Sequence, residues 1–377
     1  MKIVLIHAYS RTNSGDGLLV DEAAALVREA HPSAEIALVA LDPDSFSQDE
    51  YASIVHPITG GPQSVGSVKT LTGGLRHLLL RSRPQGVQRL IDAADLVVAV
   101  GGGYLRAKHA TEAAKTLLAH RLQLPNRNDG TPFIYLPQSI GPFTPGTRML
   151  FVKSLRLAVK VVVRDDRSNQ LLRGGANVVR APDMALLGLP DEWRRDEVVE
   201  PSEDGTVGLV ARALTATSPR TRRYRRAIAG LHASGMEYLI QANARGNNDT
   251  DFYRSLGFQG EARLLRDSVR YGSADRPRVV VSVRLHGSLQ TIRSGVPSVH
   301  LSYERKGWGA YDDLGISRFV HNAFDFDPEL VRRQVEELRS DPSEYWAAVS
   351  ASIGSLREQR AGLVTLLRSA GAGRNSS

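Results

Sequence analysis

The sequence contains no cysteine among its 377 residues. This absence excludes a disulfide scaffold, a thiolate zinc site and a cysteine nucleophile, and it is consistent with a reducing compartment. Long apolar runs are also lacking, because no window approaches the ~20 apolar residues of a membrane-spanning helix. The short apolar run within residues 1–9 soon turns polar, which favours a first strand over a secretory signal. We therefore expect a cytoplasmic protein.

The formal net charge is +8, and most of the cations are arginine. A basic surplus can favour binding to nucleic acid, to a membrane surface or to small anionic substrates. A genome composition that favours arginine codons would explain the surplus equally well. The cations are scattered, and no basic stripe with interleaved aromatic residues is present, so the sequence does not favour a nucleic-acid partner. Peripheral contact with the inner face of a membrane is compatible with this charge.

Strand-like and helix-like segments alternate along most of the chain. In the first half, six apolar runs are separated by helical patterns such as residues 16–30; the runs are residues 2–9, 35–41, 95–102, 132–138, 159–165 and 177–183. They are continuously apolar rather than alternating, as expected where both faces of a parallel sheet are covered. This pattern predicts a doubly wound α/β domain over residues 1–190.

A polar stretch, residues 190–205, is the best linker candidate, and the alternation then restarts. Four more apolar runs predict a second α/β domain over residues 206–340; they are residues 206–213, 237–243, 278–284 and 298–303. Residues 327–340 and 343–370 are typical of helices. We expect the segment 341–377 to pack back across the domain junction and to end in a frayed tail.

Unusual polar residues gather where the predicted strands end, which is where open α/β sheets bind ligands. In the first domain these candidates are Asn13, Asp16, Gly101, Gly102, Gly103, Gln138, Ser139, Arg164 and Asp183. Each has an ordinary alternative role: a helix cap, a crowded or proline-rich turn, or a surface pair of Arg164 with Asp166. The glycine run lacks the GxGxxG spacing, so a dinucleotide site is not favoured.

In the second domain the candidates are Arg212, Gln241, Asn243, Arg284, His286, Gly287, Ser288 and Lys306. The segment "SVRLHG" is the most informative, because a buried strand ends in an arginine, a histidine and a glycine just where a helix begins. A helix start attracts anions, arginine binds phosphate and carboxylate, and His286 can hold or give a proton near neutral pH. These residues together predict an anion site with its own proton donor.

The ordered segments "NSGDGLLV", "VGGGYL", "QSIGP", "VVVRD", "APDMAL", "VSVRLHG" and "PSVHLSYERKGWG…DLGI" resemble the polysaccharide pyruvyl transferase family over residues 1 to about 320. The resemblance implies a glycosyltransferase-B-like (GT-B-like) fold of two Rossmann-like domains facing a cleft. It also implies transfer of the enolpyruvyl unit of phosphoenolpyruvate to sugar hydroxyls of a glycan or glycolipid, usually as a pyruvate ketal. It implies no metal and no cofactor. Residues 60–85 match no pattern and leave recognition of the acceptor open.

The RxH motif associated with the donor site in that family maps onto Arg284 and His286. On this basis we expect the acceptor on the first domain and phosphoenolpyruvate on the second. Arg284 and the helix start would hold the phosphate, assisted by Arg212 or Lys306, with Arg164 near the acceptor or the carboxylate. His286 is the candidate general acid, and Asp16 or Asp183 the candidate base.

Two other functions fit the same pattern. A nucleotide-sugar glycosyltransferase of this architecture would bind a diphosphate at the second-domain helix start and would need an acid for the ribose, for which Asp249 is the candidate. A two-lobed protein that binds an anionic ligand without chemistry is the alternative outside enzymes.

Overall fold

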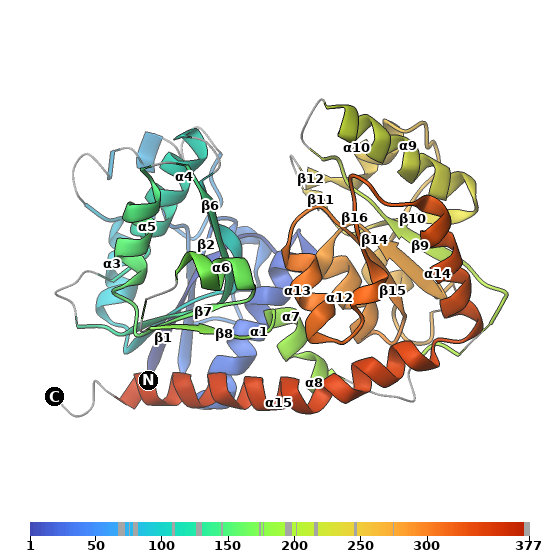
Figure 1. Ribbon diagram of the computed structural model, residues 1–377. Coiled ribbons are helices and arrows are strands. Elements are labelled where there is room, and N and C mark those ends of the chain that lie inside the picture. The colour runs from blue at the N-terminus through green and yellow to red at the C-terminus, as the bar shows by residue number, and fades with distance from the viewer. Residues whose placement is uncertain are drawn as a thin grey trace. The chain divides into compact units, whose positions relative to one another are not determined.

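The computed structural model describes residues 1–377 except 67–71, 75, 78–81, 108–109, 126–129, 145, 173–174, 176, 193–197, 201, 215–217, 245–246, 274 and 373–377. The chain divides into two compact units (Figure 1). The first unit comprises Met1–Arg11, Asp16–Leu187 and Glu358–Ser377; the second comprises Thr12–Gly15 and Gly188–Arg357. A short piece of the N-terminal region thus belongs to the second unit, and the end of the chain belongs to the first.

The first unit is built on a parallel sheet whose strands run in the order β3-β2-β1-β4-β6-β7-β8, with β5 paired to β6. The order reverses direction between β1 and β4, which is the switch point where such sheets bind ligands. The strands are β1 (Lys2–Ala8), β2 (Glu35–Ala40), β3 (Ser53–Val55), β4 (Leu96–Ala99), β5 (Gly102–Ala107), β6 (Phe133–Phe143), β7 (Lys160–Val163) and β8 (Val178–Arg180).

Successive residues of these strands enter two different core clusters. Ile3 and Leu5 of β1 lie in one cluster, and Val4 and Ile6 lie in the other. Both faces of the sheet are therefore buried, which explains why its strands are continuously apolar. The helices of this unit are α1 (Ser14–Ala30), η1 (Pro43–Ser45), α3 (Gln85–Asp92), α4 (Ala110–Arg121), α5 (Arg148–Leu155), α6 (Asp166–Leu171) and α7 (Met184–Leu187).

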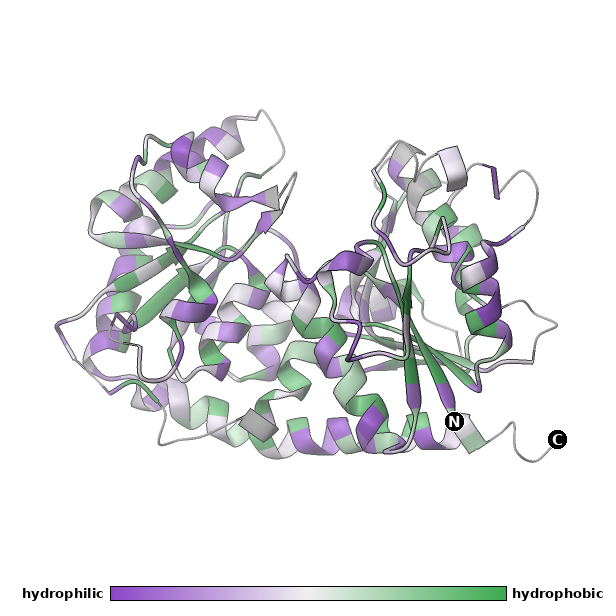
Figure 2. Ribbon diagram, turned by 180° about the vertical axis from the view of Figure 1, so that it is seen from behind, coloured by the Kyte–Doolittle hydropathy of each residue, from purple (hydrophilic) through white to green (hydrophobic). Residues whose placement is uncertain are grey.

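The second unit has a six-stranded parallel sheet in the order β13-β10-β9-β14-β15-β16, which reverses between β9 and β14. Its strands are β9 (Val207–Val210), β10 (Met236–Ile240), β13 (Arg263–Leu264), β14 (Val279–Ser282), β15 (Ser298–Ser302) and β16 (Val320–Asn322). A separate antiparallel pair joins β11 (Asn243–Ala244) to β12 (Asn247–Asn248). Figure 2 shows mostly hydrophobic strands in both sheets and helices of mixed character.

The helices of the second unit include α12, which starts directly after β14, at the position expected for the anion site. The helices are α8 (Leu189–Glu192), α9 (Pro219–Ala233), α10 (Asp249–Arg254), α11 (Leu265–Ser268), α12 (Leu285–Arg293), α13 (Lys306–Asp313), η3 (Ser317–Phe319) and α14 (Pro328–Ser340). The expected organisation of two parallel α/β sheets is confirmed.

The last helix, α15 (Ser343–Ala372), contributes residues to both units. Near its start, the Tyr345 hydroxyl accepts a hydrogen bond from the Ser298 amide at 3.1 Å in the second unit. Near its end, Leu363, Val364, Leu367 and Ala370 lie in a core cluster of the first unit.

Within the first unit, Arg360 of α15 is held by acids of α1. Its Nε donates to Glu29 at 2.9 Å, its Nη1 lies 3.5 Å from Glu22, and it also donates to the Leu187 carbonyl at 3.2 Å. The end of α15 is therefore an integral part of the first unit.

The stretch 190–205, predicted as a linker, lies partly outside the described residues (193–197 and 201). Where it is described, Val199 is buried in a core cluster of the second unit, and its amide donates to the Gly295 carbonyl at 2.8 Å. Among the residues described, no helix combines the length and the apolar character needed to span a bilayer.

Candidate functional site

The residues of the predicted anion site lie at the switch point of the second unit, between β9 and β14. Arg212 follows β9, and Arg284 and His286 follow the neighbouring strand β14, so the carboxyl ends of two paired parallel strands bring them to the same edge. Arg284 is the N-cap residue of α12 and makes no side-chain cap bond to it. The α12 amide dipoles therefore start at this edge and are not capped by the Arg284 side chain, a setting that favours an anion.

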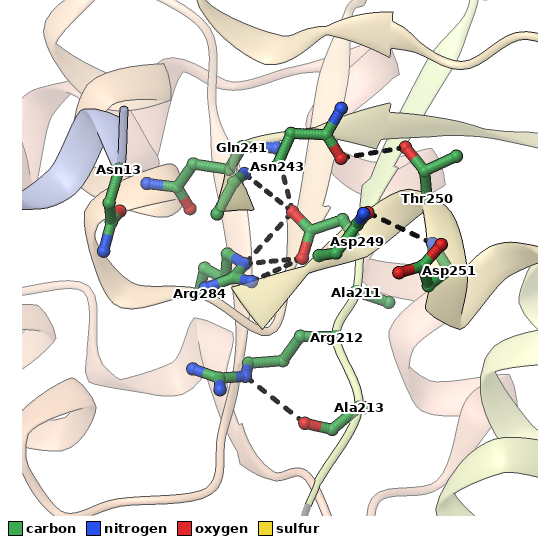
Figure 3. A network of polar contacts seen from close by, with 12 residues as sticks. Asn13, Ala211, Arg212, Ala213, Gln241, Asn243, Asp249, Thr250, Asp251 and Arg284 are labelled. Atoms are coloured by element: carbon green, nitrogen blue, oxygen red, sulfur yellow. Dashed lines mark hydrogen bonds and ion pairs between the residues drawn. The ribbon is translucent and has the colours of Figure 1, made fainter. Parts of the chain in front are cut away.

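Arg284 is engaged by a carboxylate of its own unit. Its Nε donates to both Asp249 oxygens, at 3.0 and 3.1 Å, and its Nη2 also bonds to Oδ1 (Figure 3). The Arg284 side chain is 8% exposed and that of Asp249 is 0% exposed. This ion pair is buried and is close to neutral as a unit, so Arg284 contributes little net charge for a substrate phosphate.

Asp249 also organises the loop that follows β10. Its Oδ2 accepts hydrogen bonds from the amides of Gln241 and Ala242, at 3.0 and 2.9 Å (Figure 3). Asn243 lies in the same loop but is exposed, and its Oδ1 accepts from Thr250 at 3.2 Å. Asp249, the acid considered for a nucleotide ribose, is therefore committed to the polypeptide itself.

The segment Thr12–Gly15 joins this site as part of the second unit. Asn13 forms a backbone bridge with Ala242, and the Ser14 hydroxyl donates to the Gln241 carbonyl at 3.1 Å. Gly15 lies against His286: a Cβ built on Gly15 would be 2.6 Å from His286 Nδ1. The glycine is required here because only its hydrogen leaves room for the imidazole. Asn13 and His286 are thereby brought into one site.

Two further cations of the second unit differ in their pairing. Among the described residues, Arg212 is paired with no carboxylate; its Nη1 donates to the Tyr303 hydroxyl at 3.1 Å and its guanidinium lies over the Tyr303 ring. Lys306 lies 3.2 Å from Glu304. Arg212 is therefore the strand-end cation whose charge is not compensated within the described part of the chain.

The first residues of α12 are packed tightly rather than open. A Cβ on Gly287 would meet Gln241 Oε1 at 2.5 Å and Ser282 Oγ at 2.9 Å. Ser288 is buried, and its hydroxyl lies 3.1 Å from Nδ1 of His300 on β15. Gly287 and Ser288 thus pack α12 against the sheet. The space beside both residues is occupied by protein atoms.

His300 provides a pH prediction for the second unit. Burial lowers the pKa of His300 to about 3. The unfolded chain takes up a proton at this group near pH ~6.5, and the folded chain does not. Above pH ~6.5 neither state is protonated there, so the stability contribution of this group is fully present. Its contribution falls by about 1.4 kcal/mol per pH unit below that, until about pH 3. Urea unfolding followed by tryptophan fluorescence should show a steeper loss of stability below pH 6 in wild type than in His300→Asn, whose amide can still donate to the Ser282 carbonyl. Equal slopes would contradict this.

The first unit contains a second buried ion pair. Arg164, after β7, bonds through Nη1 to Asp183 Oδ2 at 2.5 Å, and both side chains are almost completely buried. The Arg164 Nε also donates to Ser139 at 2.9 Å, while Asp183 Oδ1 accepts from the Ala185 amide. Arg164, Ser139 and Asp183 are thus brought together, and the pairing is with Asp183; Asp166 instead lies 3.6 Å from Arg180.

Protein atoms occupy the space beside each of the three glycines that follow β4. A Cβ on Gly101 would meet Met184 Cγ at 2.5 Å, one on Gly103 would lie 3.2 Å from Arg164 Nη2, and one on Gly102 would lie 3.3 Å from the Tyr104 ring. Gln138 is completely buried, and its Nε2 donates to the Tyr104 hydroxyl at 2.7 Å. Asp16 is half-buried in the first turn of α1.

Sequence reasoning missed two buried histidines of the first unit, His7 and His120, whose rings lie 4.8 Å apart between centroids. A lone histidine in an apolar run carries no visible signal of such a partner. In the described part of the chain, no group of three or more His, Cys, Asp or Glu residues is arranged to hold a metal ion.

Comparison with solved structures supports the fold. The E. coli trehalose-6-phosphate structure bound with UDP-2-fluoro glucose matches with a TM-score of 0.56 and 12% identity, covering 98% of this chain and 99% of that chain. UGT73P12 of Glycyrrhiza uralensis, complexed with glycyrrhetinic acid 3-O-monoglucuronide, matches with a TM-score of 0.52 and 10% identity over 100% and 97% of the two chains. Anabaena Alr3699/HepE in complex with UDP and glucose gives 0.51 and 12% over 100% and 99%. The fold is that of GT-B glycosyltransferases.

Comparison at the level of sequence gives the family. No curated protein matches the chain. The family model described as polysaccharide pyruvyl transferase matches residues 13–263, which is more than half of the 377 residues. That range includes Asn13, Gly15, Arg212 and Asp249 of the site described above. The chain belongs to the polysaccharide pyruvyl transferase family.

Proposed function

We propose that the protein transfers the pyruvyl group of phosphoenolpyruvate to hydroxyl groups of a saccharide or lipid-linked saccharide and forms a pyruvate ketal. The observation that carries this proposal is the placement of His286 at the start of α12, at the sheet edge where paired strands β9 and β14 end and where Arg212 meets no carboxylate among the described residues. Family membership supports the same reaction.

The roles of the cations follow from their pairing. Phosphoenolpyruvate carries both a phosphate and a carboxylate, so it needs positive charge that is not already neutralised. Arg212 and the amides at the start of α12 meet this need, with Lys306 assisting despite its contact with Glu304. Arg284 acts instead as a positioning residue: through Asp249 it fixes the Gln241–Ala242 backbone on which Asn13 and Ser14 dock.

The reaction needs an acid. His286 protonates the methylene carbon of phosphoenolpyruvate, which makes the neighbouring carbon electrophilic. A sugar hydroxyl attacks that carbon, and the phosphate leaves with the bridging oxygen. A second hydroxyl closes the ketal ring, so the two hydroxyl protons balance the proton given to carbon and the one carried by phosphate. Asp16 and Asp183 remain the two candidates for the base, and Asp183 is bonded to Arg164.

A nucleotide-sugar-dependent glycosyl transfer is less well supported, because Asp249, the loop acid suited to a ribose, is 0% exposed and bonded to Arg284 and two amides. Mass spectrometry distinguishes the two reactions. Incubation with phosphoenolpyruvate and a panel of glycans and lipid-linked glycans should add a three-carbon pyruvyl unit to one of them and release inorganic phosphate. Addition of a whole hexose from a UDP-hexose, with no pyruvyl product across the panel, would refute the proposal.

A further inference from the structure

His7 is turned to an unusual side of its strand. Along β1, Ile3 and Leu5 face one core cluster and Val4 and Ile6 face the other, so regular alternation would place His7 with Leu5. The pairing of β1 with β2 instead shifts register between Leu5 and Ala8, and His7 has a φ of 67°. As a result the His7 ring lies against Tyr104, His120 and Tyr135, while Ala8 joins the cluster of Leu5.

This conformation costs energy and is held in place. In the described part of the chain His7 is the only non-glycine residue with a positive φ, a state that costs about 1–2 kcal/mol for an L-residue. Its amide, displaced from the strand ladder, donates to Gln123 Oε1 at 2.8 Å, and Gln123 in turn donates to the Ala119 carbonyl of α4. Bulges that redirect a side chain in this way are frequent next to binding sites.

The hydrogen-bond network assigns the proton of the His7 ring. The Tyr104 hydroxyl donates to the Val100 carbonyl at 2.9 Å and accepts from Gln138 at 2.7 Å. It must therefore also accept its third bond, at 3.0 Å, from His7 Nδ1, which carries the proton. His7 Nε2 is then a buried acceptor, and it has no hydrogen-bond partner among the described residues.

His120 presents the complementary group. The buried Tyr135 hydroxyl makes one hydrogen bond within the described residues, to His120 Nε2 at 3.0 Å, and it has to donate that bond for its own proton to be satisfied. The proton of the His120 ring is then on Nδ1, which is buried and has no partner within the described part of the chain. His7 and His120 thus offer one acceptor and one donor on neighbouring rings.

These histidines line a pocket of the first unit with a volume of about 440 Å³. Tyr9, Tyr104, His56 and Thr116 also line it, together with aliphatic side chains, and the described lining includes no Asp, Glu, Lys or Arg. His56 Nδ1 accepts the amides of Ile58 and Thr59, so its proton is on Nε2 as a further donor. Pockets of this size and mixed lining bind small molecules.

The pocket keeps its histidines uncharged near neutral pH. Burial lowers the pKa of His120 to about 3. Burial, and then the nearby His120, hold the pKa of His7 well below its ordinary value, and burial also lowers that of His56. A charged ligand entering this pocket would find no opposite charge among the described lining residues to compensate its desolvation.

We propose that this pocket binds an uncharged ring that carries hydroxyl groups, with the apolar and aromatic lining against the ring and the hydroxyl groups accepting from His120 and His56 and donating to His7. A hydroxyl group suits this pair because it donates and accepts at the same time. The ligand class is a neutral saccharide or its glycoside. This inference rests on the proposed function, because it names a pocket for the saccharide, but the binding itself requires no phosphoenolpyruvate.

The test is calorimetric titration of the full-length protein with a panel of 4-nitrophenyl glycosides of neutral hexoses, and with 4-nitrophenyl glucuronide as the charged counterpart. At least one neutral glycoside should bind saturably, and the glucuronide should bind at least about tenfold more weakly. Ala119→Phe, which fills the pocket from α4, should weaken the neutral ligand by at least about tenfold. Ala114→Phe, on an exposed position of the same helix, is the matched control and should bind as wild type.

Val65→Trp provides a second variant, because Val65 is a half-buried loop residue of the lining and tolerates substitution better than a helix position. Absence of binding by every neutral glycoside, or wild-type binding by both the Ala119 and Val65 variants with unchanged melting temperature, would overturn the proposal. Equal affinity for the glucuronide would do the same. Because no phosphoenolpyruvate is present, failure here is distinct from failure of the transfer reaction.

Discussion

Replacing Arg284 with methionine is expected to destabilise the second unit by about 3–5 kcal/mol, because it leaves the carboxylate of Asp249 buried without its cation. The expectation rests on burial, since Asp249 is 0% exposed and Arg284 8% exposed. The double variant Arg284→Met/Asp249→Asn should recover a large part of this loss, because the uncompensated charge is gone and the Asn oxygen can still accept an amide of the loop. Urea unfolding followed by tryptophan fluorescence measures all three.

Arg263 is a matched control in the same unit. It pairs with Glu237 at 2.8 Å and with Asp275 at 3.1 Å, but its side chain is 36% exposed and its partners are more exposed still. Exposed pairs contribute about 0–1 kcal/mol, so Arg263→Met should cost no more than that. If Arg284→Met costs no more than Arg263→Met and instead mainly raises the KM for phosphoenolpyruvate, Arg284 is a phosphate ligand and the positioning role is wrong.

Replacing His286 with glutamine should lower kcat for pyruvyl transfer by about 10²–10⁴-fold, the usual contribution of a positioned general acid. The KM for phosphoenolpyruvate should change little, because Arg212 and the α12 amides remain. The unfolding curve should also stay close to that of wild type, since His286 is half-buried and is not part of the buried ion pair. Steady-state kinetics with phosphate release as the readout measures both constants, and a fully active variant would remove His286 from the mechanism.

Gly15→Ala tests the same histidine without altering it. The added methyl would lie 2.6 Å from His286 Nδ1, so the ring has to move, and kcat should fall although the imidazole is still present. Gly354→Ala is the matched control, because it lies in α15 and a Cβ there meets nothing within 4 Å. It should leave activity unchanged and slightly favour the helix. Equal activity of the two variants would show that Gly15 does not position His286.

Most of the central sheet strands were predictable because they are continuous apolar runs whose two faces are both buried. The predicted run at residues 278–284 corresponds to β14 (Val279–Ser282), and the run at 298–303 to β15 (Ser298–Ser302). The short strands β3 and β13 were not predicted, because three and two residues leave no periodicity to detect. β5 was missed since its glycines are typical of a turn.

For the site, the sequence indicated which residues end the strands but not how their charges are paired. Arg284 and Asp249 are 35 residues apart in the chain, and Arg164 and Asp183 are 19 apart; no local pattern states that each arginine meets a buried acid. His7 escaped notice for a different reason: in an apolar run only the register shift of β1 determines which face it takes. The sequence pattern therefore identifies the polar side chains at the strand ends, but only the tertiary structure shows which partners they contact.

The first unit begins the chain, but its core is completed by residues that come after the second unit in the sequence. The first unit takes up residues 358–377 only after the whole second unit has been traversed, and four apolar residues from that end belong to its core. During synthesis, the first 187 residues must therefore leave the ribosome with an apolar face uncovered, and that face stays open until residues 363–370 have been made. A chaperone that shields this surface would act on residues 1–187 even though the segment that finally covers it follows the second unit in the sequence.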